Sequence, residues 1–91
     1  MRNTTAVVTE TFTLPHPGGY DTVTTTLYCR AYTLDGQLHR LDGPARVWTD
    51  ARVNEWFVHG LRHRDDGPAI ESDTVNSWWC LGHVVDWCAA A

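Results

Sequence analysis

Apolar and polar residues alternate along short stretches of this chain, and glycine or proline separates each stretch from the next. In residues 4–14, Val8 and Phe12 share one parity while threonines occupy the other, which is the pattern of a half-buried strand. Residues 15–19 hold two prolines and two glycines and interrupt the pattern. Residues 22–34, rich in threonine and tyrosine, predict a second strand that pairs with the first as a long hairpin.

Shorter strands and tight turns follow. The expected strands span residues 45–49, 53–58, 68–72, 75–81 and 83–87. Asp35-Gly36 predicts a hairpin turn because Asp-Gly readily adopts the positive φ angles of a type I′ turn, and His59-Gly60 and Gly82 mark two more. A helical spacing of apolar residues never persists over ten residues. The sequence therefore predicts an all-β fold, an antiparallel meander of short hairpins.

A repeat underlies this alternation. The segments that begin at Gly36 and Gly60 share the glycine, a His-Arg pair and Asp-Gly-Pro-Ala at an offset of 24 residues. An aromatic residue precedes each glycine by four positions: Tyr32 in the first segment and Trp56 in the second. A shortened third copy begins at Trp78, 22 residues after Trp56. About 2.5 repeats of 22–24 residues are thus present, which indicates a small repeat protein.

The length allows one domain over residues 1–91. We divide it into an N-terminal β-hairpin region (1–31), a repeat region (32–87) and a short tail (88–91).

Each residue type of the repeated motif has a local structural use. Glycine before proline permits backbone angles closed to other residues, and proline suits the first position of a strand. Aspartate can accept hydrogen bonds from turn amides, or a charge-assisted bond from the neighbouring His-Arg pair. We therefore interpret the motif as structural. Its residues are His39, Arg40, Asp42, Gly43 and Pro44, then His63, Arg64, Asp66, Gly67 and Pro68.

Composition and charge narrow the classes of partner. All seven basic residues are arginine, and the net charge is −4, carried entirely by residues 35–91. An acidic repeat region argues against nucleic-acid binding, which needs clustered positive charge. No apolar stretch approaches the ~20 residues of a membrane span. We expect neither a nucleic-acid nor a membrane partner.

Catalytic and metal sites are not predicted. His63-Arg64-Asp65 spells the catalytic triplet of protein kinases, but the chain lacks lysine and the glycine-rich loop that kinases need. His59 and His63 have the spacing of a zinc-ligand pair, without the second pair that zinc sites usually show. We expect no catalytic residues, no metal and no cofactor, and we interpret the protein as a non-enzyme.

The cysteines and the N-terminus bear on the compartment. Cys29, Cys80 and Cys88 form an odd set without metal-ligand spacing, and the first ten residues lack the apolar run of a signal peptide. These features predict a cytoplasmic protein with free thiols. Cys80 and Cys88 are interpreted as small core residues rather than nucleophiles.

The five tryptophans are the most unusual feature of the composition. One interpretation places them all in the core, where a thin sheet needs large side chains. The other adds an interface, because Trp78 and Trp79 must point to opposite faces of a regular strand, so that at least one is exposed or covered by a partner or the N-terminal hairpin. Tryptophan rimmed by arginine is typical of a protein-binding hot spot. The candidate binding residues are Trp48, Trp56, Trp78, Trp79, Arg46 and Arg62.

The motif His-Arg-x-Asp-Gly-Pro-Ala, with its preceding aromatic residue and glycine, resembles a short repeat of uncharacterised phage and giant-virus proteins. Those repeats are similar to MORN repeats, whose units are β-hairpins stacked into an elongated sheet. The resemblance covers about residues 32–87. It implies a phage-encoded protein acting in the cytoplasm of the host cell, and the third copy, which lacks Asp-Gly-Pro-Ala, resembles a terminal capping repeat.

Three functions remain open from the sequence. The leading hypothesis is a small protein-interaction module that binds a host or viral protein, as an inhibitor of a host factor or as a virion or assembly accessory. The first alternative is a protein that sequesters a nucleotide-like ligand between tryptophans and arginines such as Arg40 and Arg64. The second is a structural homo-oligomer that assembles through its edge strands.

Overall fold

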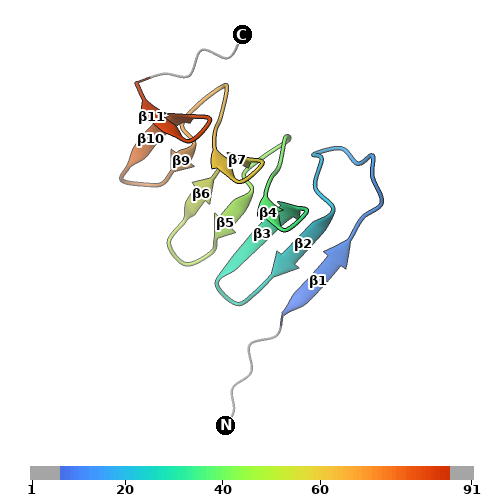
Figure 1. The fold of residues 1–91 in the computed structure, drawn as a ribbon. Coiled ribbons are helices and arrows are strands. Elements are labelled where there is room, and N and C mark those ends of the chain that lie inside the picture. Colours follow the sequence, from blue (N-terminus) through green and yellow to red (C-terminus); the bar gives the residue numbers. More distant parts are fainter. Residues whose placement is uncertain (1–6, 87–91) are drawn as a thin grey trace.

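The computed structural model describes residues 7–86, which form an all-β, antiparallel meander (Figure 1). Nine strands make one open sheet in the order β1-β2-β3-β5-β6-β9-β10-β11, with β4 paired to β3 off this path. β7 and β8 form a separate two-stranded sheet. The strands are β1 Val8–Thr11, β2 Thr22–Thr25, β3 Cys29–Leu34, β4 Gln37–Leu38, β5 Arg46–Trp48, β6 Val53–Glu55, β7 Phe57–Val58, β8 Leu61–Arg62, β9 Ile70–Glu71, β10 Asn76–Cys80 and β11 His83–Val85.

The repeat is visible as a short hairpin inserted into the meander once per unit. β3 turns back through β4 before the chain continues to β5, and the β7–β8 hairpin lies between β6 and β9 in sequence. In the third copy β10 and β11 form the corresponding hairpin. Figure 1 shows these hairpins following one another along the sheet.

The three hairpin turns have the type I′ geometry that the sequence predicts. The φ angles are 50° and 80° at Asp35-Gly36, 49° and 78° at His59-Gly60, and 47° and 85° at Leu81-Gly82. Both central residues of a type I′ turn need positive φ, which glycine adopts without steric cost at the second position.

Histidine of the motif holds the next hairpin in place. His39 Nδ1 accepts a hydrogen bond of 2.9 Å from the backbone N–H of His59, and His63 Nδ1 accepts one of 3.0 Å from that of Leu81. Each donor is the first central residue of the following turn. His39 is only 3% exposed, and its neutral form with the proton on Nε2 leaves Nδ1 free to accept this bond. The histidine is therefore a link between repeats rather than a partner of the motif aspartate.

Arginine of the motif lies on the aromatic residue of its own repeat. The Cζ atom of Arg40 is 4.0 Å from the centre of the Tyr32 ring, and that of Arg64 is 3.8 Å from the ring of Trp56. Each arginine Nε also donates to the motif aspartate, at 2.7 Å to Asp42 and 2.9 Å to Asp66. Each Nη1 donates to a proline carbonyl, of Pro44 and Pro68 respectively. We call each set of aromatic, arginine and aspartate an arginine–aromatic unit.

The glycine before each proline leaves room for this arginine. A Cβ atom at Gly43 would lie 2.8 Å from Arg40 Cζ, and one at Gly67 would lie 2.8 Å from Arg64 Cζ. Neither glycine has a positive φ. The prediction that glycine supplies unusual backbone angles here is therefore wrong; it supplies space. Of the two kinds of partner expected for Asp42 and Asp66, the charge-assisted bond from the neighbouring arginine is the one observed.

The sheet is thin and has a small apolar core. Its shortest dimension is 17 Å, and no large side chain is fully buried among the described residues. Ala45 and Ala69, the alanines of the motif, are 0% exposed, and the backbone of each is hydrogen-bonded on both sides within the sheet. The remaining buried apolar residues are Val23, Tyr32 and Phe57. Contacts of arginine, histidine and glutamate must therefore contribute much of the stability.

The N-terminal region differs from its prediction in two respects. β1 is only four residues long, and all four are exposed, so it is not the half-buried strand expected over residues 4–14. The predicted strand over residues 22–34 is two strands, β2 and β3, separated by a turn. Thr26 makes this turn, since its Oγ1 accepts hydrogen bonds from the N–H groups of Tyr28 and Cys29. A threonine can organise a tight turn in this way without glycine or proline.

The repeat strands are shorter than predicted, and the strand expected over residues 53–58 breaks at Trp56 into β6 and β7. Trp56 N–H bonds to Ala69 O in the sheet, and Trp56 O accepts from His63 N–H. The chain thus leaves the main sheet at this residue to enter the inserted hairpin.

The cysteines behave differently from one another. Cys29 is a free thiol near Thr26, whereas Cys80 is disulfide-bonded, so the prediction of free thiols is wrong for Cys80. Cys88, like Trp87 at the end of the predicted last strand, lies outside the described residues.

Across residues 7–86, no helix is long and apolar enough to cross a membrane.

We predict that Gly67→Ala destabilises the protein by about 1–3 kcal/mol, because the new methyl group displaces Arg64 from its ring and hydrogen bonds. Urea unfolding of a double-mutant cycle with Arg64→Ala measures this coupling. In the Arg64→Ala background, Gly67→Ala should lower the free energy of unfolding much less, since the arginine side chain that the methyl group would displace is absent. An equal cost in both backgrounds would show that the glycine serves some other purpose.

The histidine link predicts a pH dependence. Burial, and secondarily the positive charge of nearby His59, lowers the pKa of His39 below its usual value. The unfolded chain therefore binds a proton more readily, so stability is full above about pH 6.5 and declines as the pH falls below it. In His39→Asn the amide oxygen can still accept from His59 N–H but does not titrate. Between pH 7.5 and 5.5, the free energy of unfolding should fall less in this variant than in the wild type. In the exposed-site control His83→Asn it should fall as much as in the wild type.

Candidate functional site

The two faces of the sheet carry different sets of polar side chains. Arg46 and Arg62 both bond to Glu55 and both lie near the ring of Phe57, so Glu55 and Phe57 share one face, while Trp56 lies under Arg64 on the other. Directly paired residues share a face, which places Arg46 beside Glu55. We call these the glutamate face and the motif face.

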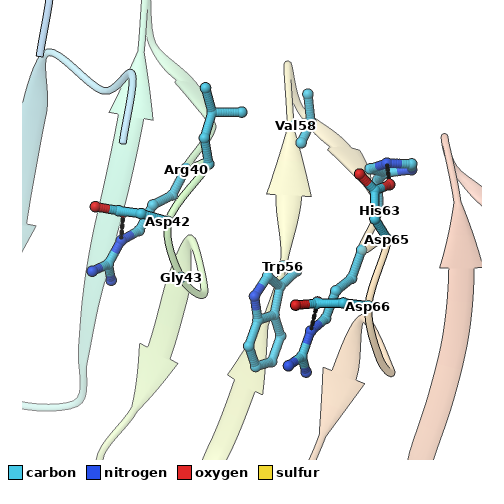
Figure 2. Close-up of a pocket in the computed structure, with 10 residues that line it drawn as sticks. Arg40, Asp42, Gly43, Trp56, Val58, His63, Asp65 and Asp66 are labelled. Carbon is cyan, nitrogen blue, oxygen red and sulfur yellow. Dashed lines mark hydrogen bonds and ion pairs between the residues drawn. The ribbon is translucent and has the colours of Figure 1, made fainter. Parts of the chain in front are cut away.

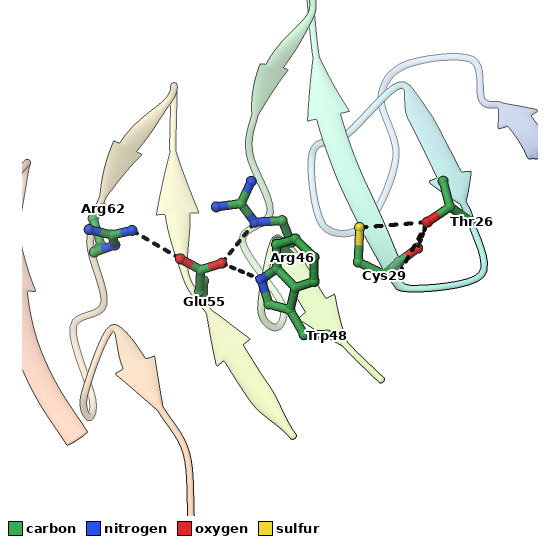
Figure 3. A network of polar contacts seen from close by, with 6 residues as sticks. All are labelled: Thr26, Cys29, Arg46, Trp48, Glu55 and Arg62. Carbon is green, nitrogen blue, oxygen red and sulfur yellow. Dashed lines mark hydrogen bonds and ion pairs between the residues drawn. The ribbon is translucent and has the colours of Figure 1, made fainter. Parts of the chain in front are cut away.

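Glu55 is the centre of the glutamate face (Figure 3). It is 6% exposed and receives three hydrogen bonds. Its Oε1 accepts from Arg46 Nε and Trp48 Nε1, both at 2.7 Å, and its Oε2 accepts from Arg62 Nη2 at 2.9 Å. Arg62 also lies over the ring of Trp79, with Cζ 4.9 Å from its centre. The network joins side chains of both full repeats and the third copy.

Burial by itself would raise the pKa of the Glu55 carboxyl. The hydrogen bonds from Arg46, Trp48 and Arg62, with the charge of Arg46, outweigh burial and hold this pKa below its usual value. Glu55 therefore stays ionised and serves as the acceptor that orients three neighbouring side chains. It is a structural carboxylate, not a general acid.

The motif face carries a hollow of about 490 Å³ between the loops of the two full repeats (Figure 2). Arg40, Leu41, Asp42 and Gly43 line one side, and His63, Arg64, Asp65 and Asp66 line the other. Trp56 and Val58 lie between the two loops. The hollow therefore combines an indole ring with convergent charged groups, as ligand and partner sites commonly do.

The arginines of this hollow are already engaged. Arg40 and Arg64 each bond to an aspartate and a proline carbonyl, and their side chains are 20% and 19% exposed. Asp65, paired with His63 Nε2 and 61% exposed, adds a third carboxylate. Two arginines thus face three aspartates, so the hollow favours a ligand with positive rather than negative charge.

A second hollow, of about 560 Å³, lies at the turn ends of β5, β6 and β9. Trp48 and Asn54 line it together with the weakly associated, exposed ion pair of Arg52 and Asp73, whose nearest atoms are 3.9 Å apart. Exposed pairs of this kind contribute little energy. The hollow between the repeat loops is the better candidate because its polar groups are held by the fold.

The structure separates the six predicted binding residues. Trp48, Arg46, Arg62 and Trp79 gather around Glu55, whereas Trp56 lines the hollow on the opposite face. Trp78 precedes Trp79 in β10, so it points to the motif face. Trp78 and Trp79 are both half-buried, so neither is the exposed residue that the sequence allowed for.

His59 and His63, the two histidines with zinc-ligand spacing, make separate contacts. The rings of His39 and His59 lie 4.4 Å apart, while His63 turns to Leu81 and Asp65. Within residues 7–86 there is no group of three or more histidine, cysteine or acidic side chains suited to a metal ion.

Sequence reasoning missed Glu55, Asp65 and Val58. Glu55 is not part of the repeated motif, and its one distinguishing sequence feature is that it is the only charged residue of the predicted strand 53–58. The sequence does contain a signal for Asp65. This residue replaces Leu41 at the same motif position and so marks where the two repeats differ.

No family model, no curated protein and no solved structure matches this chain.

We predict that Glu55→Gln destabilises the protein by about 2 kcal/mol at pH 7, since a neutral amide cannot satisfy the two arginines as a carboxylate does. Because the pKa of Glu55 is lowered in the folded state, its contribution is present above the unfolded value of about 4.3 and is lost as the pH falls further. As the pH is lowered, the free energy of unfolding of the variant should accordingly fall less than that of the wild type. Glu10→Gln, on the exposed strand β1, is the matched control and should change neither the stability at pH 7 nor its decline in acid.

Proposed function

We propose that the protein is a small non-catalytic interaction module, and that it binds a partner protein through the hollow between the loops of its two full repeats. The observation that supports this most is the position of Trp56 between two rigid loops with the apolar Leu41 and Val58 beside it. Aromatic side chains set among arginines are typical hot spots of protein interfaces. The partner is a host or viral protein, in keeping with the resemblance of the repeat to phage sequences.

The charge arrangement disfavours a nucleotide-like ligand. Arg40, Arg46, Arg62 and Arg64 all bond to carboxylates: Arg40 to Asp42, Arg64 to Asp66, and both Arg46 and Arg62 to Glu55. A phosphate would have to compete with these bonds and approach three aspartates. A protein surface with apolar and basic groups meets neither obstacle.

Native mass spectrometry of tagged protein isolated from its natural host tests the proposal. We expect a stoichiometric protein partner with the wild type, and its loss with Asp65→Lys, which reverses the charge of the hollow at an exposed position. Asp50→Lys makes the same change in charge in the exposed β5–β6 turn and should retain the partner.

A monomer without a partner, in a host that is shown to express the protein normally, would contradict the interaction function. A homo-oligomer that survives both substitutions would instead indicate assembly through the edge strands β1 and β11. A complex retained by Asp65→Lys would move the interface away from the hollow.

A further inference from the structure

The loop between β1 and β2 packs against the first arginine–aromatic unit. The ring of Tyr20 lies 4.8 Å from the ring of Tyr32 at an angle of 68°, and Arg40 Cζ is 5.9 Å from the Tyr20 ring. The carbonyl of Gly18 accepts a hydrogen bond of 2.8 Å from Leu41 N–H. The segment Gly18–Gly19–Tyr20 is thus bound to the first repeat as part of the fold.

Close approach explains the two glycines of this segment. A Cβ atom at Gly18 would lie 2.7 Å from Asp42 Oδ1, and one at Gly19 would lie 3.1 Å from both His39 Nε2 and Leu41 Cδ1. Their φ angles are 96° and 74°, which glycine adopts most readily. A turn of two glycines followed by an aromatic residue is therefore what this surface of a repeat accepts.

The second repeat presents the same surface without such a segment. At an offset of 24 residues, the counterparts of the residues contacted by Gly18–Tyr20 are Trp56, His63, Arg64, Asp65 and Asp66, in place of Tyr32, His39, Arg40, Leu41 and Asp42. All five counterparts line the hollow of the proposed interface. Among the described residues, the N–H of Asp65 has no acceptor equivalent to the Gly18 carbonyl. The space that the chain fills on its first repeat is open on its second.

Two differences from the first repeat define the ligand further. Asp65 stands where Leu41 stands, so a basic side chain beside the turn would gain an ion pair that the first repeat cannot form. Asp21, which follows Tyr20, accepts from Asp35 N–H, but the corresponding N–H of His59 already bonds to His39 Nδ1. A ligand of the second repeat therefore needs no carboxylate after its aromatic residue.

We propose that the hollow beside Trp56 binds an exposed turn of a partner protein in which two glycines precede an aromatic residue and a basic residue lies beside them. This inference rests on the proposed interaction function and specifies its partner. The aromatic ring packs against Trp56 near Arg64, the first glycine carbonyl accepts from Asp65 N–H, and the basic side chain pairs with the Asp65 carboxylate. The contacts are those that Gly18–Tyr20 makes on Tyr32, Arg40 and Leu41.

A capped synthetic peptide of residues 13–22 carrying Pro17→Lys and Asp21→Asn is the probe, titrated into the full chain and followed by two-dimensional NMR. Residue 17 directly precedes the glycine whose carbonyl accepts from Leu41 N–H, the counterpart of Asp65 N–H, and Asp21→Asn removes the carboxylate that the second repeat does not need. We expect shifts at the Trp56 indole N–H and the Asp65 amide. Replacing the tyrosine of the peptide by alanine should weaken binding by at least about tenfold, as loss of an aromatic anchor does. The same peptide with Pro17→Gln in place of Pro17→Lys should bind about two- to fivefold more weakly than the lysine form, as expected for an exposed charge interaction.

The protein variant Asp65→Asn removes the charge at an exposed position and should reduce the difference between the lysine and glutamine peptides to less than about twofold. Its NMR spectrum reports directly whether the fold is retained. An unchanged difference would overturn the pairing with Asp65.

Two results would overturn the recognition of the turn itself. Shifts centred on Tyr32 and Leu41, with none at Trp56 and Asp65, would mean that the peptide only displaces Tyr20 from the first repeat. Absence of binding at millimolar peptide would also reject it. If native mass spectrometry still gave a partner sensitive to Asp65→Lys, the interaction function would stand and only the turn motif would fail.

Discussion

The structure depends on arginine side chains that lie over aromatic rings. In a sheet 17 Å thick the described residues include no large side chain that is fully buried, so apolar burial alone gives limited stability. Arg40 on Tyr32 and Arg64 on Trp56 join a stacking contact to hydrogen bonds with an aspartate and a proline carbonyl. Lysine cannot supply this planar, multiply bonded contact. The motif glycine leaves room for the guanidinium.

Histidine and glutamate extend these units into a continuous sheet. His39 and His63 tie each repeat to the turn of the next one, and Glu55 joins Arg46 to Arg62 on the opposite face. Each connection involves nearest neighbours, as in larger repeat proteins. The surface left between adjacent repeats then depends on what the connecting loops place there. On the first repeat the N-terminal loop fills it, and on the second it remains a hollow beside Trp56.

The sequence predicts much of this fold because the signals are local. Gly36 and Gly60 mark their turns through backbone conformation, and the 24-residue offset establishes the repeat without reference to three-dimensional contacts. It does not predict Thr26 as a turn residue, since threonine is common in strands. Nor does it reveal why Gly67 is glycine, because the reason is a contact with Arg64 rather than a backbone angle.

The candidate site was predicted less well than the fold. The composition indicates Trp56 as a binding residue, but it indicates Trp79 and Arg62 equally. Those two residues lie on the other face, around Glu55. Face assignment required the strand register, which a residue count through broken strands such as 53–58 does not provide. Asp65, by contrast, differs from Leu41 in otherwise matching repeats.

The most direct test of this account is the stability of Arg64→Lys measured by urea unfolding beside Arg52→Lys. Both variants keep the positive charge, but Arg64 stacks on Trp56 whereas the side chain of Arg52 is 80% exposed. The account predicts a loss of about 2 kcal/mol for Arg64→Lys, from the stack and the charge-assisted bonds, and less than about 0.5 kcal/mol for Arg52→Lys. Equal stability of the two variants would contradict the central role of the arginine–aromatic unit.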